Sequence, residues 1–69
     1  MILKLAMITD LNNGNELVLQ ESALGTTNIY DTANKFLASY HESFFSVLEE
    51  YLIKRNYKLQ QIDDYKVEI

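Results

Sequence analysis

The sequence predicts a two-layer α+β domain, in which an antiparallel sheet of three or four strands carries one long amphipathic helix on one face. Three observations predict this fold. An Asn-Gly pair at Asn13 and Gly14 separates two apolar runs, apolar residues then recur at helical spacing over residues 29–55, and the C-terminal tail alternates apolar and polar residues. The strands are expected to form an N-terminal β-hairpin and a C-terminal strand or hairpin.

The first two strands are expected over residues 2–9 and 16–21, and two registers compete for them. A two-residue turn at Asn13 and Gly14 would set Ile8 opposite Leu19. A three-residue loop with Gly14 in the left-handed conformation would instead set Met7 opposite Leu19. We favour this second register because it gathers apolar side chains on one side of the hairpin. These are Leu3, Leu5, Met7, Leu17 and Leu19. The other side is less polar than a fully solvated face should be.

The helix is expected to begin after an N-cap at Thr27 or Asn28, to run from Ile29 to Arg55 and to end near Asn56, which tolerates the left-handed conformation. Its apolar positions repeat every three or four residues, which is not strand alternation. In the tail, the sequence leaves open whether residues 57–60 form a strand or a loop. Residues 65–69 are predicted to form a strand.

The chain of 69 residues is expected to be a single domain over residues 1–69, near the lower size limit for a core that one chain can hold. Hydrophobic residues make up 48% of it and charged residues 23%, which is typical of a globular protein. Because the chain has no cysteine, neither a disulfide nor a thiolate metal site can reinforce this core. Oligomerisation is therefore the expected reinforcement.

The net charge of −4 argues against direct binding to nucleic acid, which requires a basic surface. The apolar start of the chain is interrupted by Lys4 and ended by Asp10, so it is too short for a signal peptide or a membrane span. The sequence therefore predicts a cytoplasmic protein that does not contact a membrane. The abundance of Ile, Asn, Lys and Tyr is typical of an AT-rich genome, such as that of a low-GC bacterium or its phage.

The predicted helix would be about 40 Å long, whereas strands of the predicted length reach only about 20 Å. Either the helix breaks within residues 39–43, or part of it packs on another surface. A seam at alternating steps of three and four residues favours packing against another helix. The seam consists of Ala38, His41, Phe45, Leu48 and Leu52. The sequence thus predicts a homodimer through this seam, and the alternative is a wider core that covers Phe45 and Leu52 within one chain.

His41 is the only histidine, and it is the first residue to consider for catalysis or metal binding. Its neighbours at three and four positions on a helix are Leu37, Ala38, Phe44 and Phe45, none of which can bind a metal or orient an imidazole. We therefore predict no catalytic, cofactor-binding or metal-binding residue. The expected function is that of a small, acidic, non-enzymatic protein-binding module.

Three glutamates, Glu42, Glu49 and Glu50, are expected on the polar side of the helix. The simpler interpretation is a solvated acidic face. The alternative is a binding surface whose carboxylates imitate the phosphates of a nucleic acid and occupy a basic groove of a nucleic-acid-processing protein, as a phage inhibitor would.

Overall fold

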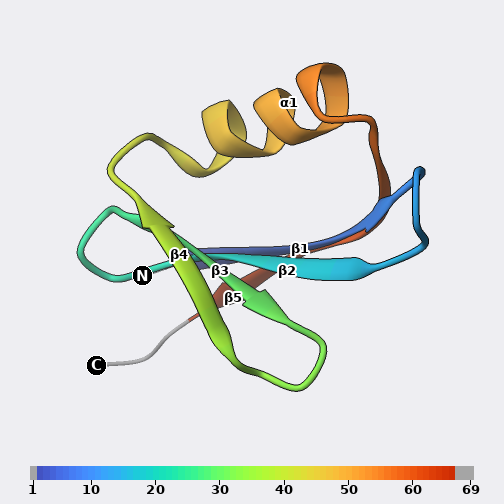
Figure 1. Cartoon of the computed structure of the whole chain (residues 1–69). Coiled ribbons are helices and arrows are strands. Elements are labelled where there is room, and N and C mark those ends of the chain that lie inside the picture. Colours follow the sequence, from blue (N-terminus) through green and yellow to red (C-terminus); the bar gives the residue numbers. More distant parts are fainter. Residues whose placement is uncertain (1, 67–69) are drawn as a thin grey trace.

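Five antiparallel strands form one sheet, and a short helix lies across one of its faces (Figure 1). The computed structural model describes the backbone of residues 2–66 and the side chains of residues 3–63. The elements in chain order are β1 (Ile2–Asp10), β2 (Glu16–Glu21), β3 (Thr27–Asp31), β4 (Phe36–Tyr40), α1 (Phe44–Lys54) and β5 (Tyr57–Lys66). The strand order in the sheet is β4-β3-β2-β1-β5, so the first and last strands are neighbours.

The prediction of a sheet of three or four strands under one long helix is wrong. Residues 29–40, expected to form the first part of that helix, belong to the β3–β4 hairpin, and α1 has only 11 residues. The turn chemistry of the hairpin explains the difference. The carboxylate of Asp31 accepts hydrogen bonds from the backbone N–H groups of Ala33 and Lys35, both at 2.9 Å, and Asn34 adopts a left-handed φ of 65°. These side-chain hydrogen bonds favour a chain reversal, because they occupy backbone N–H groups that a helix would use for its own hydrogen bonds.

The helix begins after Ser43 and not after Thr27 or Asn28, which lie in β3. The hydroxyl of Ser43 accepts a hydrogen bond from the backbone N–H of Ser46 at 3.3 Å, which satisfies one of the free donors at the helix start. The predicted end near Asn56 is confirmed, because the helix stops at Lys54 and Asn56 has a left-handed φ of 60°. None of the described residues belongs to a helix with the length and apolarity that crossing a membrane requires.

The β1–β2 hairpin has neither predicted register, because it closes one residue earlier in β1 than the favoured three-residue loop and two residues earlier than the two-residue turn. Asp10 N–H donates to the carbonyl of Asn15, and Gly14 N–H donates to the carbonyl of Asp10, each at 2.7 Å, so the loop has four residues, 11–14. Gly14 has the predicted left-handed φ, at 78°. The side chains of Asp10 and Asn13 accept hydrogen bonds from backbone N–H groups two residues ahead, both at 2.8 Å, and this stabilises the longer loop.

This shift of one residue exchanges the two faces of β1. Ala6 now pairs with Leu19 and Ile8 with Leu17, and Ala6, Ile8 and Leu19 lie fully buried under α1. Leu3, Leu5 and Met7, which were expected beside Leu17 and Leu19, lie on the opposite face of the sheet. The buried apolar residues are Ala6, Ile8, Leu19, Ile29, Phe44, Val47, Leu48 and Tyr51.

Strand β5 is a single strand that pairs with the whole of β1. Residues 57–60, for which the sequence left strand and loop open, belong to it. The pairing contains a bulge, because Met7 lies opposite Gln61 while Ile8 lies opposite Leu59, which leaves Gln60 as the extra residue. Of the strand predicted over residues 65–69, Tyr65 and Lys66 have backbone positions in β5, and residues 67–69 lie outside the described part of the chain.

The register of β1 predicts opposite outcomes for the same substitution at two adjacent residues. Ile8→Lys would place a charge in the core and should abolish the cooperative unfolding transition. Met7→Lys, on the half-exposed face, should keep this transition with a much smaller loss of stability. Thermal unfolding followed by circular dichroism tests both variants, and the reverse order of stabilities would contradict the observed register.

Candidate functional site

One face of the sheet has no covering layer among the described residues, as Figure 1 shows below the strands. The centre of this face is apolar. We call it the open face, and it consists of Leu3, Leu5, Met7, Val18, Tyr30 and Phe36. All six side chains are at least partly exposed, Phe36 to 54%. The rings of Tyr30 and Phe36 pack edge to face, with centroids 5.8 Å apart, and so form one continuous aromatic surface.

Uncharged polar residues, Gln20, Asn28 and Ser39, flank the apolar residues of the open face, and the hydroxyl of Ser39 donates to the side-chain oxygen of Asn28 at 2.8 Å.

The sequence contains a pattern that indicates a second apolar face. In β1, apolar residues occupy successive positions and do not alternate strictly with polar ones, a pattern typical of strands that are buried on both faces. The low polarity expected for the second side of the hairpin reflects the same pattern.

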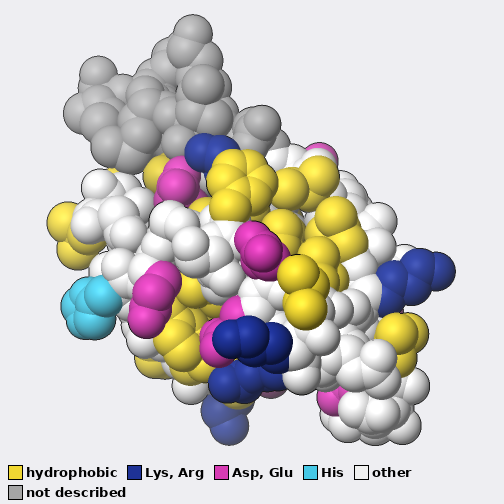
Figure 2. Space-filling model, turned by 90° about the horizontal axis from the view of Figure 1, so that it is seen from above, with side chains coloured by type: hydrophobic (Ala, Val, Ile, Leu, Met, Phe, Trp, Pro, Cys, Tyr) yellow, Lys and Arg dark blue, Asp and Glu magenta, His cyan; other side chains and the backbone are white. Residues whose placement is uncertain are grey.

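A second apolar surface lies along the side of α1 that faces β5. Phe45 is 55% exposed, and Leu59 and Ile62 of β5 are 37% and 44% exposed. Leu59 and Ile62 pair with Ile8 and Ala6, so they point to the same side of the sheet as the helix. We call this surface the α1–β5 flank, and it consists of Phe45, Leu48, Leu52, Leu59 and Ile62. Figure 2 shows apolar side chains gathered along this side of the helix.

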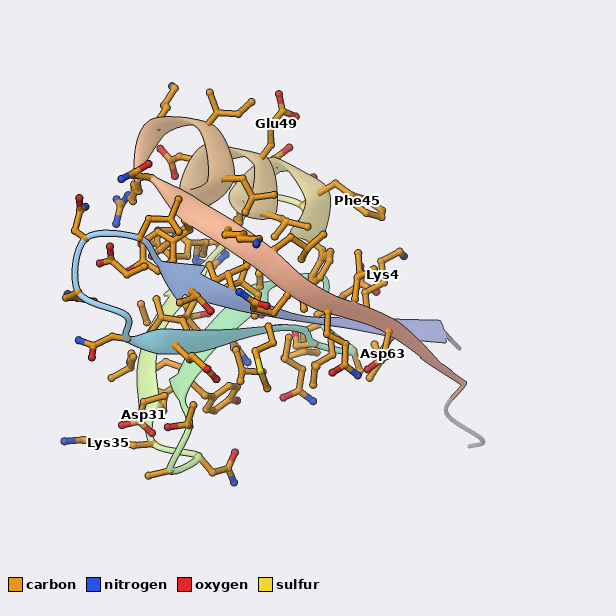
Figure 3. All side chains as sticks on the ribbon, turned by 90° about the vertical axis from the view of Figure 1, so that its right-hand side faces the viewer. Lys4, Asp31, Lys35, Phe45, Glu49 and Asp63 are labelled. Atoms are coloured by element: carbon orange, nitrogen blue, oxygen red, sulfur yellow. The ribbon has the colours of Figure 1, made fainter. Side chains whose placement is uncertain are left out.

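One end of the flank is held by Lys4. Its ammonium group lies 5.5 Å from the centroid of the Phe45 ring and 3.7 Å from the carboxylate of Glu21 (Figure 3). The cation–π contact, worth about 0.5–1 kcal/mol at an exposed site, favours this orientation of the Phe45 ring. The ring thus lies beside Lys4, near the end of β1 that pairs with the last residues of β5.

The five residues of the predicted helical seam do not lie together. Phe45, Leu48 and Leu52 share one side of α1, where Leu48 is buried and Leu52 half-buried. Ala38 lies in β4 at the opposite edge of the sheet, and His41 is exposed in the loop before α1. The seam is divided because residues 36–40 are a strand, so helical spacing does not extend back to Ala38.

The three glutamates of the predicted acidic face are brought together in part. Glu42 lies in the loop before α1, yet it lines the same shallow hollow as Glu50, and a neighbouring hollow is lined by both Glu49 and Glu50. Lys54 lines both hollows and reduces their negative potential. Over the described residues, no group of three histidine, cysteine, aspartate or glutamate side chains is placed to hold a metal ion.

A cluster of tyrosines joins the end of α1 to the sheet. Tyr51 packs edge to face against Tyr57 and Tyr40, with centroid distances of 5.2 and 6.5 Å, and its hydroxyl lies 3.2 Å from that of Tyr40. The guanidinium of Arg55 lies 4.7 Å from the Tyr51 ring centroid. Burial raises the pKa of Tyr51 above its ordinary value, and the hydrogen bond with Tyr40 raises it further. Burial also raises the pKa of Tyr57, and the nearby Asp10 carboxylate adds to this effect.

These raised pKa values predict alkaline unfolding. The folded protein holds two phenolic protons that the unfolded chain releases at about pH 10, so stability is unaffected below that pH and falls as the pH rises above it. The free energy of unfolding measured in urea should fall as the pH is raised above about 10. Ultraviolet titration should show two tyrosines that ionise at higher pH than the others. Tyr51→Phe should lessen the pH dependence above about pH 10. An unchanged slope in this variant would contradict the assignment.

Comparisons with known proteins give no family for this chain. No protein-family model, curated protein or solved structure matches it. The open face, the α1–β5 flank and the acidic hollows are therefore the features from which a function is proposed.

Proposed function

We propose that this protein is a small cytoplasmic binding protein, acting by contact and not by catalysis, and that its open face receives an amphipathic helix of a partner protein. One observation carries the proposal. The inner strand β1 is apolar on both faces, but the described residues supply a helix to only one of them. The open face has apolar side chains typical of a core, but no second layer covers them among the described residues.

The size and chemistry of the open face fit one helix. Five strands span about 19 Å from the first axis to the last, and a helix of the length of α1, about 16 Å, already covers the other face. Leu, Met, Val and Phe side chains each contribute about 1.5–3 kcal/mol when fully buried, so six half-exposed residues can contribute several kcal/mol to binding. Toward β4 the polar residues around them are uncharged, whereas Glu16, Lys58 and Asp63 lie on the same face beside Thr9 and Leu5. This arrangement favours a partner helix with an apolar contact centre and a polar rim.

Photo-crosslinking tests this surface directly. With p-benzoylphenylalanine in place of Phe36, we expect one crosslinked product of defined mass in a lysate of the cells that make the protein. Leu24, which is 90% exposed in the β2–β3 turn, is the control position, where no such product is expected despite its greater exposure. The same products at both positions, or none at Phe36, would contradict the proposal.

The substitution Met7→Lys supplies the second measurement. A charge at the centre of the open face should remove the crosslinked product while the protein stays folded, because the ammonium group cannot be buried against an apolar helix without a partner. A folded Met7→Lys variant that crosslinks as well as the parent would show that the partner binds elsewhere.

The acidic hollows support a second candidate function, the occupation of a basic groove of a nucleic-acid-processing protein. The observation in its favour is that Glu50 shares one hollow with Glu42 and the other with Glu49. We place this candidate second because Lys54 lies in both hollows.

Chromatography on immobilised polylysine can separate the effect of these hollows from that of the net charge. Glu50→Gln and Glu16→Gln each change the net charge from −4 to −3, but only Glu50 lines the hollows, since Glu16 begins β2. If the hollows bind basic surfaces, Glu50→Gln should elute at lower salt than Glu16→Gln. Equal elution of the two variants would leave only a general charge effect and reject this candidate.

A further inference from the structure

Strand β5 lies at the edge of the sheet, and one of its two edges pairs with no strand among the described residues. It has 10 residues, compared with 5 in β4 at the other edge. An unpaired strand edge presents a row of backbone donors and acceptors to which another strand can add. The exposed apolar residues of the α1–β5 flank lie directly beside this edge.

The sequence of β5 is complementary to itself when two copies run antiparallel. A twofold axis between Gln60 and Gln61 would set Lys58 opposite Asp63 of the second copy, Leu59 opposite Ile62, and Gln60 opposite Gln61. Each pair then joins opposite charges, two apolar side chains or two amides, which are favourable cross-strand combinations.

The bulge at Gln60 makes this register possible. Residues 59 and 62 are three positions apart, so in a regular strand they would point to opposite faces. In β5 both point to the helix side, because their partners in β1 are Ile8 and Ala6. Lys58 and Asp63 both point to the other side, opposite Thr9 and Leu5. The two residues of the charged pair therefore share one face, and the two residues of the apolar pair share the other.

The two copies of α1 would lie on either side of the same axis. Because α1 contacts both β2 and β5, it lies above β1, and two copies of the helix would be about 14 Å apart, given strands spaced by about 4.8 Å. Helices in direct contact are about 8–10 Å apart. The side chain of Phe45 extends away from the helix toward this gap (Figure 3), and Leu52 lies on the same side of α1.

The helix is also centred on this axis. At one end Phe45 lies beside Lys4, which pairs with Asp64, and at the other end Tyr51 packs against Tyr57. The two ends of α1 thus lie toward the two ends of β5, so an axis at Gln60 and Gln61 passes near the middle of the helix. In an antiparallel arrangement, Phe45 of one copy would face Leu52 of the other.

We propose that the protein is a symmetric homodimer in which the β5 strands of two copies pair antiparallel, with Lys58 opposite Asp63 and the two α1–β5 flanks in contact. The two sheets become one continuous sheet with both helices on the same side. The dimer uses the edge of the sheet and leaves the open face uncovered. The dimer proposal is therefore tested independently of the proposed function.

A charge exchange between β5 strands tests the register. Lys58→Asp alone would set two aspartates opposite each other at both symmetry-related positions, and Asp63→Lys alone would set two lysines there. Each variant should raise the dimer dissociation constant about tenfold or more. An equimolar mixture of the two should restore the parent value, because each strand then meets the opposite charge. Within one chain the two residues are about 15 Å apart along the strand, so restoration requires contact between chains.

Light scattering and analytical ultracentrifugation supply the measurements. The parent protein should have twice the chain mass of 8.0 kDa. Phe45→Glu should give a folded monomer, whereas Leu37→Glu, at a residue that is 47% exposed in β4 at the opposite edge of the sheet, should remain a dimer. Lys35→Asp, in the β3–β4 turn, is the charge control for Lys58→Asp and should also remain a dimer.

Three results would overturn the proposal. The first is a parent protein that stays monomeric at millimolar concentration, as it would if the bulge and charges of β5 serve only to prevent strand addition. The second is a dimer that both single charge variants leave intact or that their mixture does not restore. The third is a dimer that Met7→Lys dissociates and Phe45→Glu does not, since this would assign self-association to the open face.

Discussion

The closure of the first hairpin between Asp10 and Asn15 is the constraint on which the rest of the structure depends. Side chains in a strand alternate with a period of two, so this single pairing decides which half of β1 meets the helix. It places Ala6 and Ile8 in the core and Leu3, Leu5 and Met7 on the open face. Because β5 takes its register from β1, the same pairing also decides which side chains of the last strand lie beside α1.

Both proposed contacts follow from a core that is small for the apolar content of the chain. Eight buried apolar side chains lie between the helix and one face of the sheet. The open face and the α1–β5 flank, leaving out the buried Leu48, hold ten further apolar residues that are only partly removed from water. In small domains so much of the surface stays exposed that contact with a second chain is an effective source of further burial. The structure offers two separate places for it, one facing away from the helix and one beside it.

The features that local chemistry controls were predictable from the sequence. The reversal at Asn13 and Gly14, the left-handed Gly14 and the end of the helix near Asn56 each depend on a few adjacent residues. The state of residues 29–40 was not predictable in this way, because their apolar spacing fits a helix as well as a hairpin. Pairing with β2, distant in sequence, buries Ile29 and Thr27 and selects the strand.

For the candidate surfaces, helical spacing identified Phe45, Leu48 and Leu52. Leu59 and Ile62 could join them only through the fold, because the bulge sets the direction of their side chains.

The adjacency of β1 and β5 has a consequence for how the protein is made. These strands come from opposite ends of the described chain, so β1 leaves the ribosome long before its second neighbour exists. During that time its apolar run has an unpaired edge, and pairing between such distant segments forms slowly. Any event that removes the last strand, such as premature termination or proteolytic trimming, would leave β1 as the unpaired edge strand of the remaining sheet. Aggregation of the shortened chain, more than loss of a single contact, is then the expected outcome.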